Sequence, residues 1–490
     1  MLMVSTIIRG GYLLDLDLPL TISDVLIEDD QISAIGLDLS SPNAKIINAS
    51  GKIVMPGLIN AHTHSNQTIE KGLCDRLPLD AWMILASYGG AGSRLEPRDL
   101  YVSAMVGAIE MLSTGTTSVI DCMRPDLSWF DEGMDAVLQA YADIGMRANV
   151  AAQFADLDFF SSIPLSLINA PPEYQQDRRR ASIGDILTRA EAFLDRWENQ
   201  NPKLTPMLGP SSVPRCSIDL YQEVIKLAKR KQVRLQSHLL SAKSQVPVGN
   251  ERFGGSTVKY LNDLGALESW ASYAHGIWIS DEEIPILANS KTTIVHNPVS
   301  NQKLGAGIAP VPALDRSGVM VAIGSDGSSS GDSQNMFEVI KSAALIHRIT
   351  TPPENWLGSS DALRLCWNGG ASAIGAPVGK LAPGYKADIT ILKTGELMIG
   401  PKQQLMNALV YSEVGRSVDT VLVGGDTVLE NGQIVNVNTS ALLEEAQELA
   451  TRIWSNLPER YKAFETLRPM LEDLENAVGR LTLEFSRSCG

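Results

Sequence analysis

Between residues 56 and 375, short apolar runs rich in β-branched residues alternate with amphipathic patterns of helical period. In residues 99–112 and 218–229, apolar side chains recur every three or four positions, so that they share one face of a helix. The strand-like runs lie at 53–59, 117–121, 148–152, 205–209, 233–238, 272–276, 292–296 and 319–326. Strands that alternate with helices in this way are typical of a (β/α)8 barrel of the TIM type, whose sites gather at the C-terminal ends of the strands. We therefore predict an α/β protein with such a barrel over residues 56–375.

Both flanks of this region carry shorter β-rich segments. Residues 6–14 and 24–36 precede it, and residues 387–392 and 418–432 follow it. Their β-branched residues and intervening acidic or glycine-containing turns are typical of hairpins. We predict that residues 1–55 and 376–437 together form a small β-sandwich built from both termini.

The last part of the chain, residues 438–490, has a helical period. Two apolar stripes run from Leu442 to Leu457 and, more weakly, from Met470 to Leu481. We predict a helical C-terminal tail that packs on the barrel or on a partner subunit and carries no chemistry.

Composition narrows the class of protein. The 490 residues carry a net charge of −15, and basic runs such as Arg178–Arg180 are no longer than three residues, so a nucleic-acid or anionic membrane surface is disfavoured. No stretch approaches 18 uninterrupted apolar residues, and the N-terminal residues lack the order of a secretory signal. None of the five cysteines forms a Cys-x-x-Cys pair. We therefore expect a cytoplasmic protein with reduced thiols that acts on a small neutral or cationic molecule.

The histidines are concentrated at the ends of the predicted strands. His62 and His64 follow the first run, and in an extended segment two residues separated by one position point to the same side. Later strands end in further candidate ligands: His238, His275, His296 and Asp326. The sixth histidine, His347, lies inside a predicted helix, where we expect it at the surface or in packing.

Imidazole and carboxylate groups that converge at one rim can bind zinc, iron(II) or manganese. An open coordination position then holds a water whose pKa falls toward 7. Each residue alone has a simpler interpretation, a histidine bonded to a backbone carbonyl or an aspartate that caps a helix. Their repetition at corresponding strand ends favours the metal site.

Several segments together resemble the amidohydrolase superfamily, in particular its aminohydrolase and chlorohydrolase branch, which includes cytosine, guanine and adenosine-type deaminases and triazine hydrolases. The segments that carry this resemblance are 54–64, 237–240, 274–276, 295–301, 304–310, 324–327 and 379–388. The resemblance extends from residue 5 to about 435 and leaves out the C-terminal tail.

The resemblance implies one divalent metal ion, zinc in preference to iron(II) or manganese, held by His62, His64, His238 and Asp326. It implies catalytic roles for His275, which contacts the metal-bound hydroxide, and for Asp326, which carries a proton to the leaving nitrogen. The fourth strand, residues 205–210, has no lysine that could bridge two metals, which favours a mononuclear site.

By the same resemblance, five residues are candidates for substrate contact: Gln67, Trp82, Ser241, His296 and Asn297. For His296 and Asn297, a position behind the metal ligands is the alternative. Trp82 could equally be a packed anchor of the first helix. Ser241 is a departure, because deaminases of this branch usually read His-x-x-Glu here and the glutamate exchanges a proton with the ring nitrogen. A serine hydroxyl cannot act as an acid near neutral pH. Either another group replaces it, such as Glu251 or Lys243, or the substrate needs no ring protonation.

These observations predict a metal-dependent hydrolase that deaminates a pyrimidine, purine, pteridine or triazine and releases ammonia. One alternative is dechlorination or cyclic amide hydrolysis by the same site. A more distant one is an inactive metal-binding assembly protein. We expect a small heterocyclic substrate and association into a homodimer or higher homo-oligomer.

Overall fold

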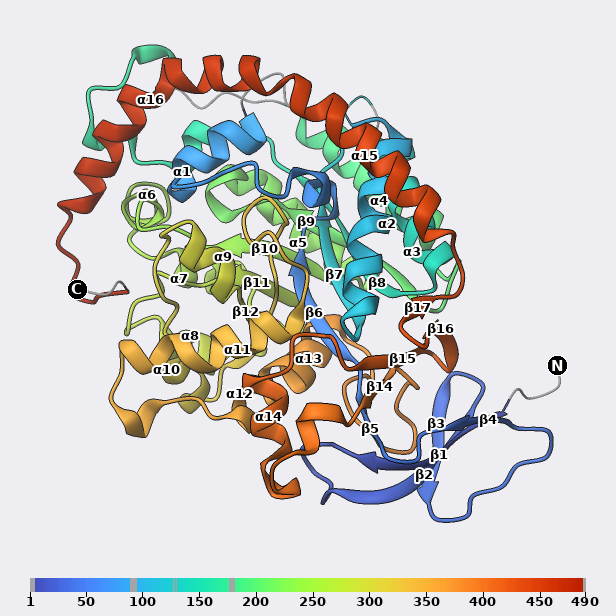
Figure 1. Cartoon of the computed structure of the whole chain (residues 1–490). Helices are drawn as coiled ribbons and strands as arrows, with labels where there is room; N and C mark the ends of the chain where they lie inside the picture. The colour runs from blue at the N-terminus through green and yellow to red at the C-terminus, as the bar shows by residue number, and fades with distance from the viewer. Residues whose placement is uncertain (1–4, 89–94, 127, 129, 176–180, 488–490) are drawn as a thin grey trace.

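The computed structural model describes residues 5–88, 95–126, 128, 130–175 and 181–487 (Figure 1). The basic run Arg178–Arg180 and Cys489 lie outside these ranges. Within them, no helix is long and apolar enough to cross a membrane.

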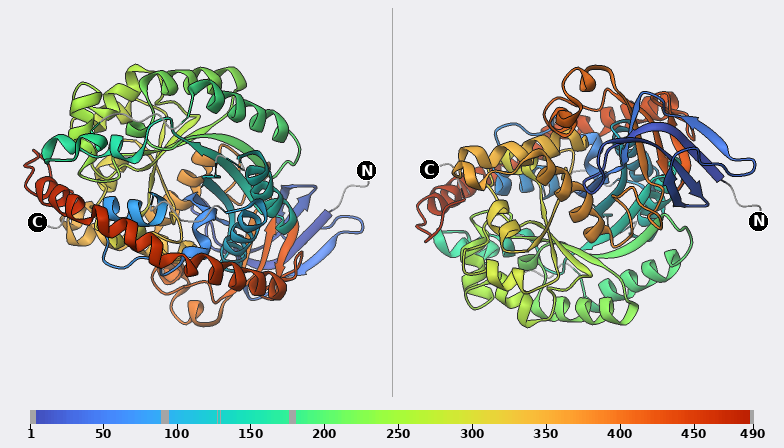
Figure 2. Two further views of the ribbon diagram at one scale, coloured as in Figure 1. Left: turned by 90° about the horizontal axis from the view of Figure 1, so that it is seen from above. Right: turned by 90° about the horizontal axis from the view of Figure 1, so that it is seen from below.

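Eight parallel strands form the barrel, and they follow one another in chain order around it (Figure 2). They are β6 (Leu58–Thr63), β7 (Thr116–Met123), β8 (Arg147–Phe154), β9 (Leu204–Pro210), β10 (Leu235–Leu239), β11 (Ala271–His275), β12 (Thr293–His296) and β13 (Met320–Ile323). At the seam between β13 and β6, the Asp326 backbone N–H donates to the His62 carbonyl at 3.0 Å. The predicted (β/α)8 barrel is confirmed.

The first predicted strand, residues 53–59, is divided between two sheets. Residues Lys52–Pro56 form β5 of the terminal sheet, and the barrel strand β6 begins only at Leu58. Gly57 lies at the break, where a Cβ atom would come within 2.2 Å of the Thr117 side chain. Only a residue without a side chain lets the chain cross from one sheet to the other this closely to β7.

The second sheet contains nine strands from both ends of the chain. They are β1 (Ser5–Leu13), β2 (Thr21–Glu28), β3 (Gln31–Gly36), β4 (Lys45–Asn48), β5, β14 (Ile389–Lys393), β15 (Val418–Val423), β16 (Asp426–Glu430) and β17 (Gln433–Ile434). The two terminal parts join where β14 pairs antiparallel with β5. A buried ion pair between Arg147 of β8 and Asp388, 2.7 Å apart, ties this sheet to the barrel.

Helices cover the outside of the barrel (Figures 1 and 2). They are α2 (Pro97–Ser113), α3 (Phe130–Ile144), α4 (Ile183–Trp197), α5 (Ile218–Lys231), α6 (Gln245–Arg252), α7 (Thr257–Asp263), α8 (Ile284–Ala288), α9 (Pro298–Lys303), α10 (Val311–Arg316), α11 (Met336–Ile346), α12 (Ser359–Arg364), α13 (Gly370–Ile374) and α14 (Leu405–Tyr411). Serine side chains cap the N-termini of α4 and α5, where Ser182 and Ser217 accept backbone N–H groups two or three residues into the helix. Both helices bury the apolar stripe that their sequence predicts.

The C-terminal tail forms α15 (Thr439–Ser455) and α16 (Leu457–Gly479). The second helix begins 13 residues before the predicted stripe at Met470, because Pro469 is accommodated inside it. It lies over α1 (Leu79–Trp82) and the following π-helical turn η2 (Met83–Tyr88), on the chain itself (Figure 1). Phe464, Leu471 and Leu474 of α16 share an apolar cluster with Trp82 and Leu85.

Candidate active site

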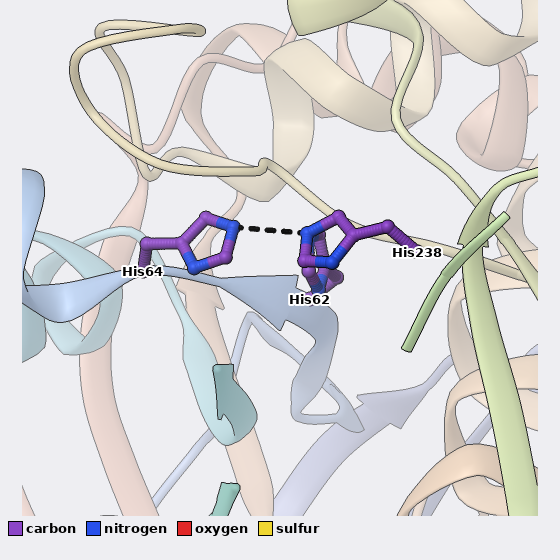
Figure 3. A group of neighbouring side chains, drawn as sticks. All are labelled: His62, His64 and His238. Carbon is purple, nitrogen blue, oxygen red and sulfur yellow. Dashed lines mark hydrogen bonds between the residues drawn. The ribbon is translucent and has the colours of Figure 1, made fainter. Parts of the chain in front are cut away.

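The ends of three barrel strands bring the predicted metal ligands together. His62 lies in β6, His64 follows it, His238 lies in β10, and Asp326 comes three residues after β13. The Nε2 atoms of His64 and His238 are 3.3 Å apart, and the two rings face each other (Figure 3). Asp326 Oδ1 is 3.5 Å from His62 Nε2 and 3.4 Å from His64 Nε2. His275, at the end of β11, forms a second cluster with His62 and Asp326 in which the ligand atoms lie within 4.8 Å of one another.

These separations are those of donors around one cation. Four ligand atoms about 2.1 Å from a tetrahedral zinc ion lie about 3.4 Å from one another. The buried His62 Nε2 has no hydrogen-bond partner, an unusual state for a polar atom with no exposure. The residues therefore fit a divalent metal ion with nitrogen and oxygen ligands.

Hydrogen bonds behind the rings orient each imidazole. Nδ1 of His62 donates to Gln236 Oε1 at 2.7 Å, and Nδ1 of His64 donates to the Cys122 carbonyl at 2.6 Å. Nδ1 of His238 donates to the Ser211 carbonyl. Because each Nδ1 carries the proton, each Nε2 presents a lone pair to the centre, which is the arrangement that metal ligation requires.

Burial and mutual repulsion keep the cluster ready for a cation. Burial lowers the pKa of His238 well below 6.5, and the neighbouring imidazoles add to the shift. Burial alone would raise the pKa of Asp326, but the His62 ring beside it, and the other imidazoles when they are protonated, hold that pKa well below its usual range. A neutral His238 and an ionised Asp326 are the protonation states that bind a divalent ion.

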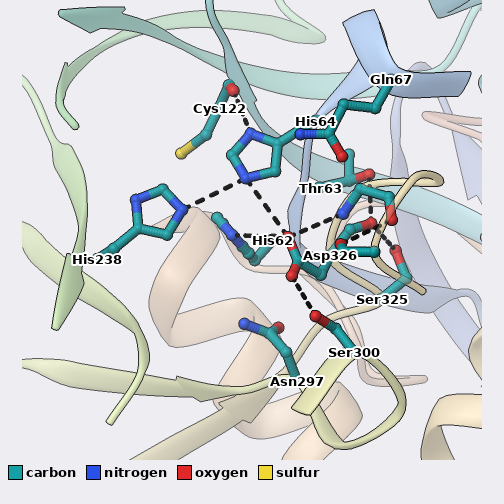
Figure 4. A network of polar contacts seen from close by, with 12 residues as sticks. His62, Thr63, His64, Gln67, Cys122, His238, Asn297, Ser300, Ser325 and Asp326 are labelled. Atoms are coloured by element: carbon teal, nitrogen blue, oxygen red, sulfur yellow. Dashed lines mark hydrogen bonds and ion pairs between the residues drawn. The ribbon is translucent and has the colours of Figure 1, made fainter. Parts of the chain in front are cut away.

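The backbone at Asp326 is held in a left-handed conformation, with φ of 62°. Its carboxylate also accepts a hydrogen bond from Ser300 Oγ at 2.5 Å and one from the Gly327 N–H at 2.8 Å (Figure 4). Left-handed residues other than glycine cost energy and persist where surrounding contacts over-determine them. This network fixes the direction of the carboxylate.

A cavity partly open to solvent lies above the cluster, and His64, His238, His275 and Asp326 reach its surface. Three of the predicted substrate contacts also line it: Gln67, Trp82 and Ser241. Trp82 is buried, its indole N–H donates to the Ser329 carbonyl at 3.2 Å, and it packs in the cluster under α16. The residue is thus both a packed anchor and part of the cavity wall.

The other two predicted substrate contacts lie elsewhere. His296 and Asn297 are buried and do not line the cavity. Asn297 Nδ2 lies 3.4 Å from Nδ1 of His275, and the His296 ring lies 5.6 Å from that of His347. Strand β12 ends at His296, so these side chains stand behind the His275 ring rather than at the cavity surface. His347 itself is buried in packing, and it begins the 3-10 turn η8 (His347–Ile349) that follows α11.

Sequence reasoning missed several polar residues of the cavity wall. They are Asn66, Glu70, Asp80, Arg124, Asp126, Gln153, Ser211, Ser212, Arg215 and Gln245. Asp80 and Glu70 lie close in sequence to Trp82 and Gln67, which is the one indication that could have suggested them. Asn66 follows β6 and Gln153 lies in β8. The remainder come from segments after β7, β9 and β10, whose paths the strand pattern does not predict.

The sequence model of a protein family, described as the amidohydrolase family, matches residues 53–428 of this chain. Over 456 residues, the chain is 32% identical to a 5-methylthioadenosine/S-adenosylhomocysteine deaminase of Carboxydothermus hydrogenoformans, which covers 92% of this chain and 98% of that protein. It is also 32% identical to a 5'-deoxyadenosine deaminase of Methanocaldococcus jannaschii over 431 residues, 87% of this chain and 95% of that one.

Solved structures share the fold. An adenosine deaminase from Xanthomonas campestris with bound zinc superposes with a TM-score of 0.81 at 24% identity, over 92% of this chain and 99% of the other. An atrazine chlorohydrolase from Arthrobacter aurescens complexed with zinc gives 0.80 at 24% identity, over 91% and 100%. With the family model spanning most of the sequence and a relative of 32% identity aligned to 92% of it, the chain belongs to the amidohydrolase family and is a hydrolase of carbon–nitrogen bonds other than peptide bonds.

Proposed function

We propose that this enzyme deaminates an amino-substituted nitrogen heterocycle of the adenosine type and releases ammonia. The observation that carries the proposal is the cluster of His62, His64, His238 and Asp326, whose donor atoms converge at the floor of a cavity that opens to solvent. The names of the curated relatives, deaminases of adenosine derivatives, support the substrate class.

We propose that these four residues hold one divalent ion, with zinc favoured because its preferred ligands are imidazole nitrogen and carboxylate oxygen. Such an ion, when bound, lowers the pKa of a coordinated water and so supplies a nucleophile at neutral pH. The relatives of known structure that contain zinc share the fold and support this choice.

Asp326 is suited to carry the proton. Its carboxylate is ionised, its outer oxygen is held by Ser300, and it lies at the cavity surface. It accepts a proton as water adds to the ring carbon and returns it to the departing amine, so that ammonia leaves. Burial lowers the pKa of His275, so its ring stays neutral, and its Nδ1 donates to Asn301 Oδ1 at 3.1 Å. The free Nε2 of His275 can then orient the attacking water.

Ser241 supports a second candidate within the same class, the hydrolysis of a cyclic amide. A serine in place of the glutamate leaves no acid at that position, and an amide bond in a ring needs no protonation of an aromatic nitrogen. The intact donor cluster argues against the inactive assembly protein considered from the sequence.

The test combines metal analysis with a substrate panel. The purified enzyme is expected to contain one zinc per chain and to release ammonia from adenosine, 5'-deoxyadenosine or 5-methylthioadenosine, with loss of activity after chelation and recovery with zinc. Parallel assays follow chloride from chlorinated triazines and ring opening of cyclic amides. Ring opening of a cyclic amide, without ammonia release from the nucleosides, would favour the second candidate. Chloride release from a triazine would instead favour the dechlorination considered from the sequence.

A further inference from the structure

The position expected to carry an acid holds a hydroxyl with no partner. Ser241 is buried, and its Oγ makes no hydrogen bond. Its backbone N–H donates to Gln245 Oε1 at 2.9 Å, so Gln245 closes this loop onto itself. If the ring nitrogen is protonated during deamination, the proton must come from another residue.

Neither neighbour in sequence can supply it. The Glu251 carboxylate accepts a hydrogen bond from Ser166 Oγ and lines a different hollow, together with Phe160 and Tyr174. Lys243 Nζ donates to the carbonyls of Gly479, at 3.4 Å, and Leu481, at 2.8 Å, at the end of α16. Both side chains therefore point away from the active-site cavity.

Among the described residues that line the cavity, four carry carboxyl groups: Glu70, Asp80, Asp126 and Asp326. Asp326 belongs to the ligand cluster, and Glu70 is paired with Arg460 at 2.9 Å. Asp126 accepts the Ser128 backbone N–H at an exposed turn. Asp80 remains: it makes no ion pair with any described residue, and unlike Asp126 it lies in a helix that packs against α16.

Asp80 lies in the first turn of α1, two residues before Trp82, and shares the cavity wall with Ser241 and Gln245. Burial raises the pKa of Asp80 to about 6, and the nearby Ser244 side chain opposes the shift. Because Asp80, Ser241 and Gln245 line the same cavity, the Asp80 carboxyl faces the space beside the loop where the family's glutamate is expected. A carboxyl group with a pKa near neutrality can act both as an acid and as a base.

Other charged groups face Asp80 from the elements around it. Glu475 of α16 packs above α1, and its own pKa is raised by burial and then by the charge of Asp80. On the cavity side, the charged residues of the wall include Glu70, Arg124 and Arg215. A second acidic group on the outer side favours the protonated form of Asp80.

We propose that Asp80, supplied by α1 instead of the loop after β10, is the acid that protonates the ring nitrogen in place of the missing glutamate. This inference rests on the proposed deamination. As the water oxygen bonds to the ring carbon, one water proton passes to Asp326 and the Asp80 proton passes to the ring nitrogen. The Asp326 proton then moves to the exocyclic amine, the carbon–nitrogen bond breaks and ammonia leaves. The remaining hydroxyl proton returns to Asp80, which leaves a carbonyl on the ring and both carboxyl groups in their starting states.

The test compares the zinc-loaded wild type with Asp80→Asn and Asp80→Glu, using whichever of the three nucleosides releases ammonia. In the wild type, kcat/KM should fall as the pH rises through about 6, because the acid must be protonated. Asp80→Asn should lose that pH dependence and about 10²–10⁴-fold in kcat/KM, the usual contribution of a general acid. Asp80→Glu should recover part of both. The matched control Glu251→Gln should keep the wild-type profile.

Two further measurements separate a chemical role from a structural one. Adding Ser241→Glu to Asp80→Asn should restore activity, because it returns an acid to the family's usual position. Binding of inosine, followed through Trp82 fluorescence, should strengthen above pH 6 in the wild type but not in Asp80→Asn, since an ionised Asp80 accepts the ring N–H. An unchanged pH profile in Asp80→Asn, or a changed one in Glu251→Gln, overturns the inference about Asp80 and leaves the proposed deamination standing. Absence of ammonia from every nucleoside overturns the proposed function and this inference with it.

Discussion

The floor and the outer wall of the cavity are built on different principles. The floor consists of side chains from barrel strand ends, each fixed by a hydrogen bond from behind, and its donors lie about as far apart as zinc ligands do. The outer wall consists of η1 (Ser65–Glu70), α1 and η2, and its position depends on a helix from the far end of the chain. The comparison teaches that the chemistry of the ion is set by the barrel, whereas the shape presented to the substrate is set by the tail.

Arg460 of α16 shows how the cavity wall depends on the C-terminal tail. Its guanidinium is almost fully buried, forms the ion pair with Glu70, and donates to the carbonyls of Leu85 and Ala86 at 2.9–3.2 Å. Glu70 and Ala86 both line the cavity. One side chain thus joins the tail to both ends of the segment that forms the wall.

The largest effect is expected from breaking the floor. Asp326→Ala and His238→Ala each remove a ligand, so activity should fall by more than about 100-fold, the upper range for loss of a group that merely supports a ligand. Zinc content, measured on the purified variants, should fall with activity. Asp143→Ala, which removes an exposed carboxylate, is the control and should keep both. Full zinc occupancy in Asp326→Ala would contradict the assigned ligand set.

Breaking the wall should affect stability and substrate binding but spare the metal. Arg460→Met leaves Glu70 as an unpaired buried carboxylate, and loss of one partner of a buried pair costs about 3–5 kcal/mol. We expect a lower free energy of unfolding in urea and a higher KM, with zinc content unchanged.

The matched control for this change is Arg468→Met on the same helix, whose pair with Glu465 is exposed. Exposed pairs contribute about 0–1 kcal/mol, so this variant should behave much like the wild type. Equal losses in the two variants would show that the buried position of Arg460 has no special role.

A smaller change to the floor should weaken the metal without removing it. Gln236→Leu takes away the acceptor that orients His62 and leaves all four ligands in place. Loss of such a supporting group typically costs about 10–100-fold in metal affinity, which competition with a chelator measures. Gln139→Leu on the exposed face of α3 should have no effect on affinity, and neither variant should alter the KM as Arg460→Met does.

The smallest predicted effect concerns stability against pH at the wall. The folded state raises the pKa of Asp80 to about 6, so the folded protein holds this proton more tightly than the unfolded chain. The stability contributed by the group is therefore present below pH 3.8 and is lost as the pH rises through about 6. Asp80→Asn should melt at a higher temperature than the wild type at pH 8, and this gain should vanish at pH 4. A gain of equal size at both values would assign it to something other than ionisation.

The sequence predicted the floor well and the wall poorly. Seven of the eight strand-like runs lie where the barrel strands β7 to β13 lie. This is because a parallel strand that is buried on both faces consists of consecutive apolar residues. The remaining run, residues 53–59, is divided between the two sheets at Gly57. The backbone passes there so close to Thr117, 60 residues away, that a side chain would not fit. Similarly, the sequence left open whether His296 contacts the substrate or stands behind the ligands, and the structure buries its ring beside that of His347, away from the cavity surface.

What the sequence alone determined is the barrel, the terminal sheet and the set of residues at the strand ends, because alternation and strand period are properties of neighbouring positions. What only the tertiary structure decided is which carboxyl groups share the cavity and what holds its wall. Glu70 and Arg460 are 390 positions apart, and Asp80 approaches the loop of Ser241 from a separate helix. Such pairs form only when distant elements pack together, and no local pattern of hydrophobic and polar residues records them.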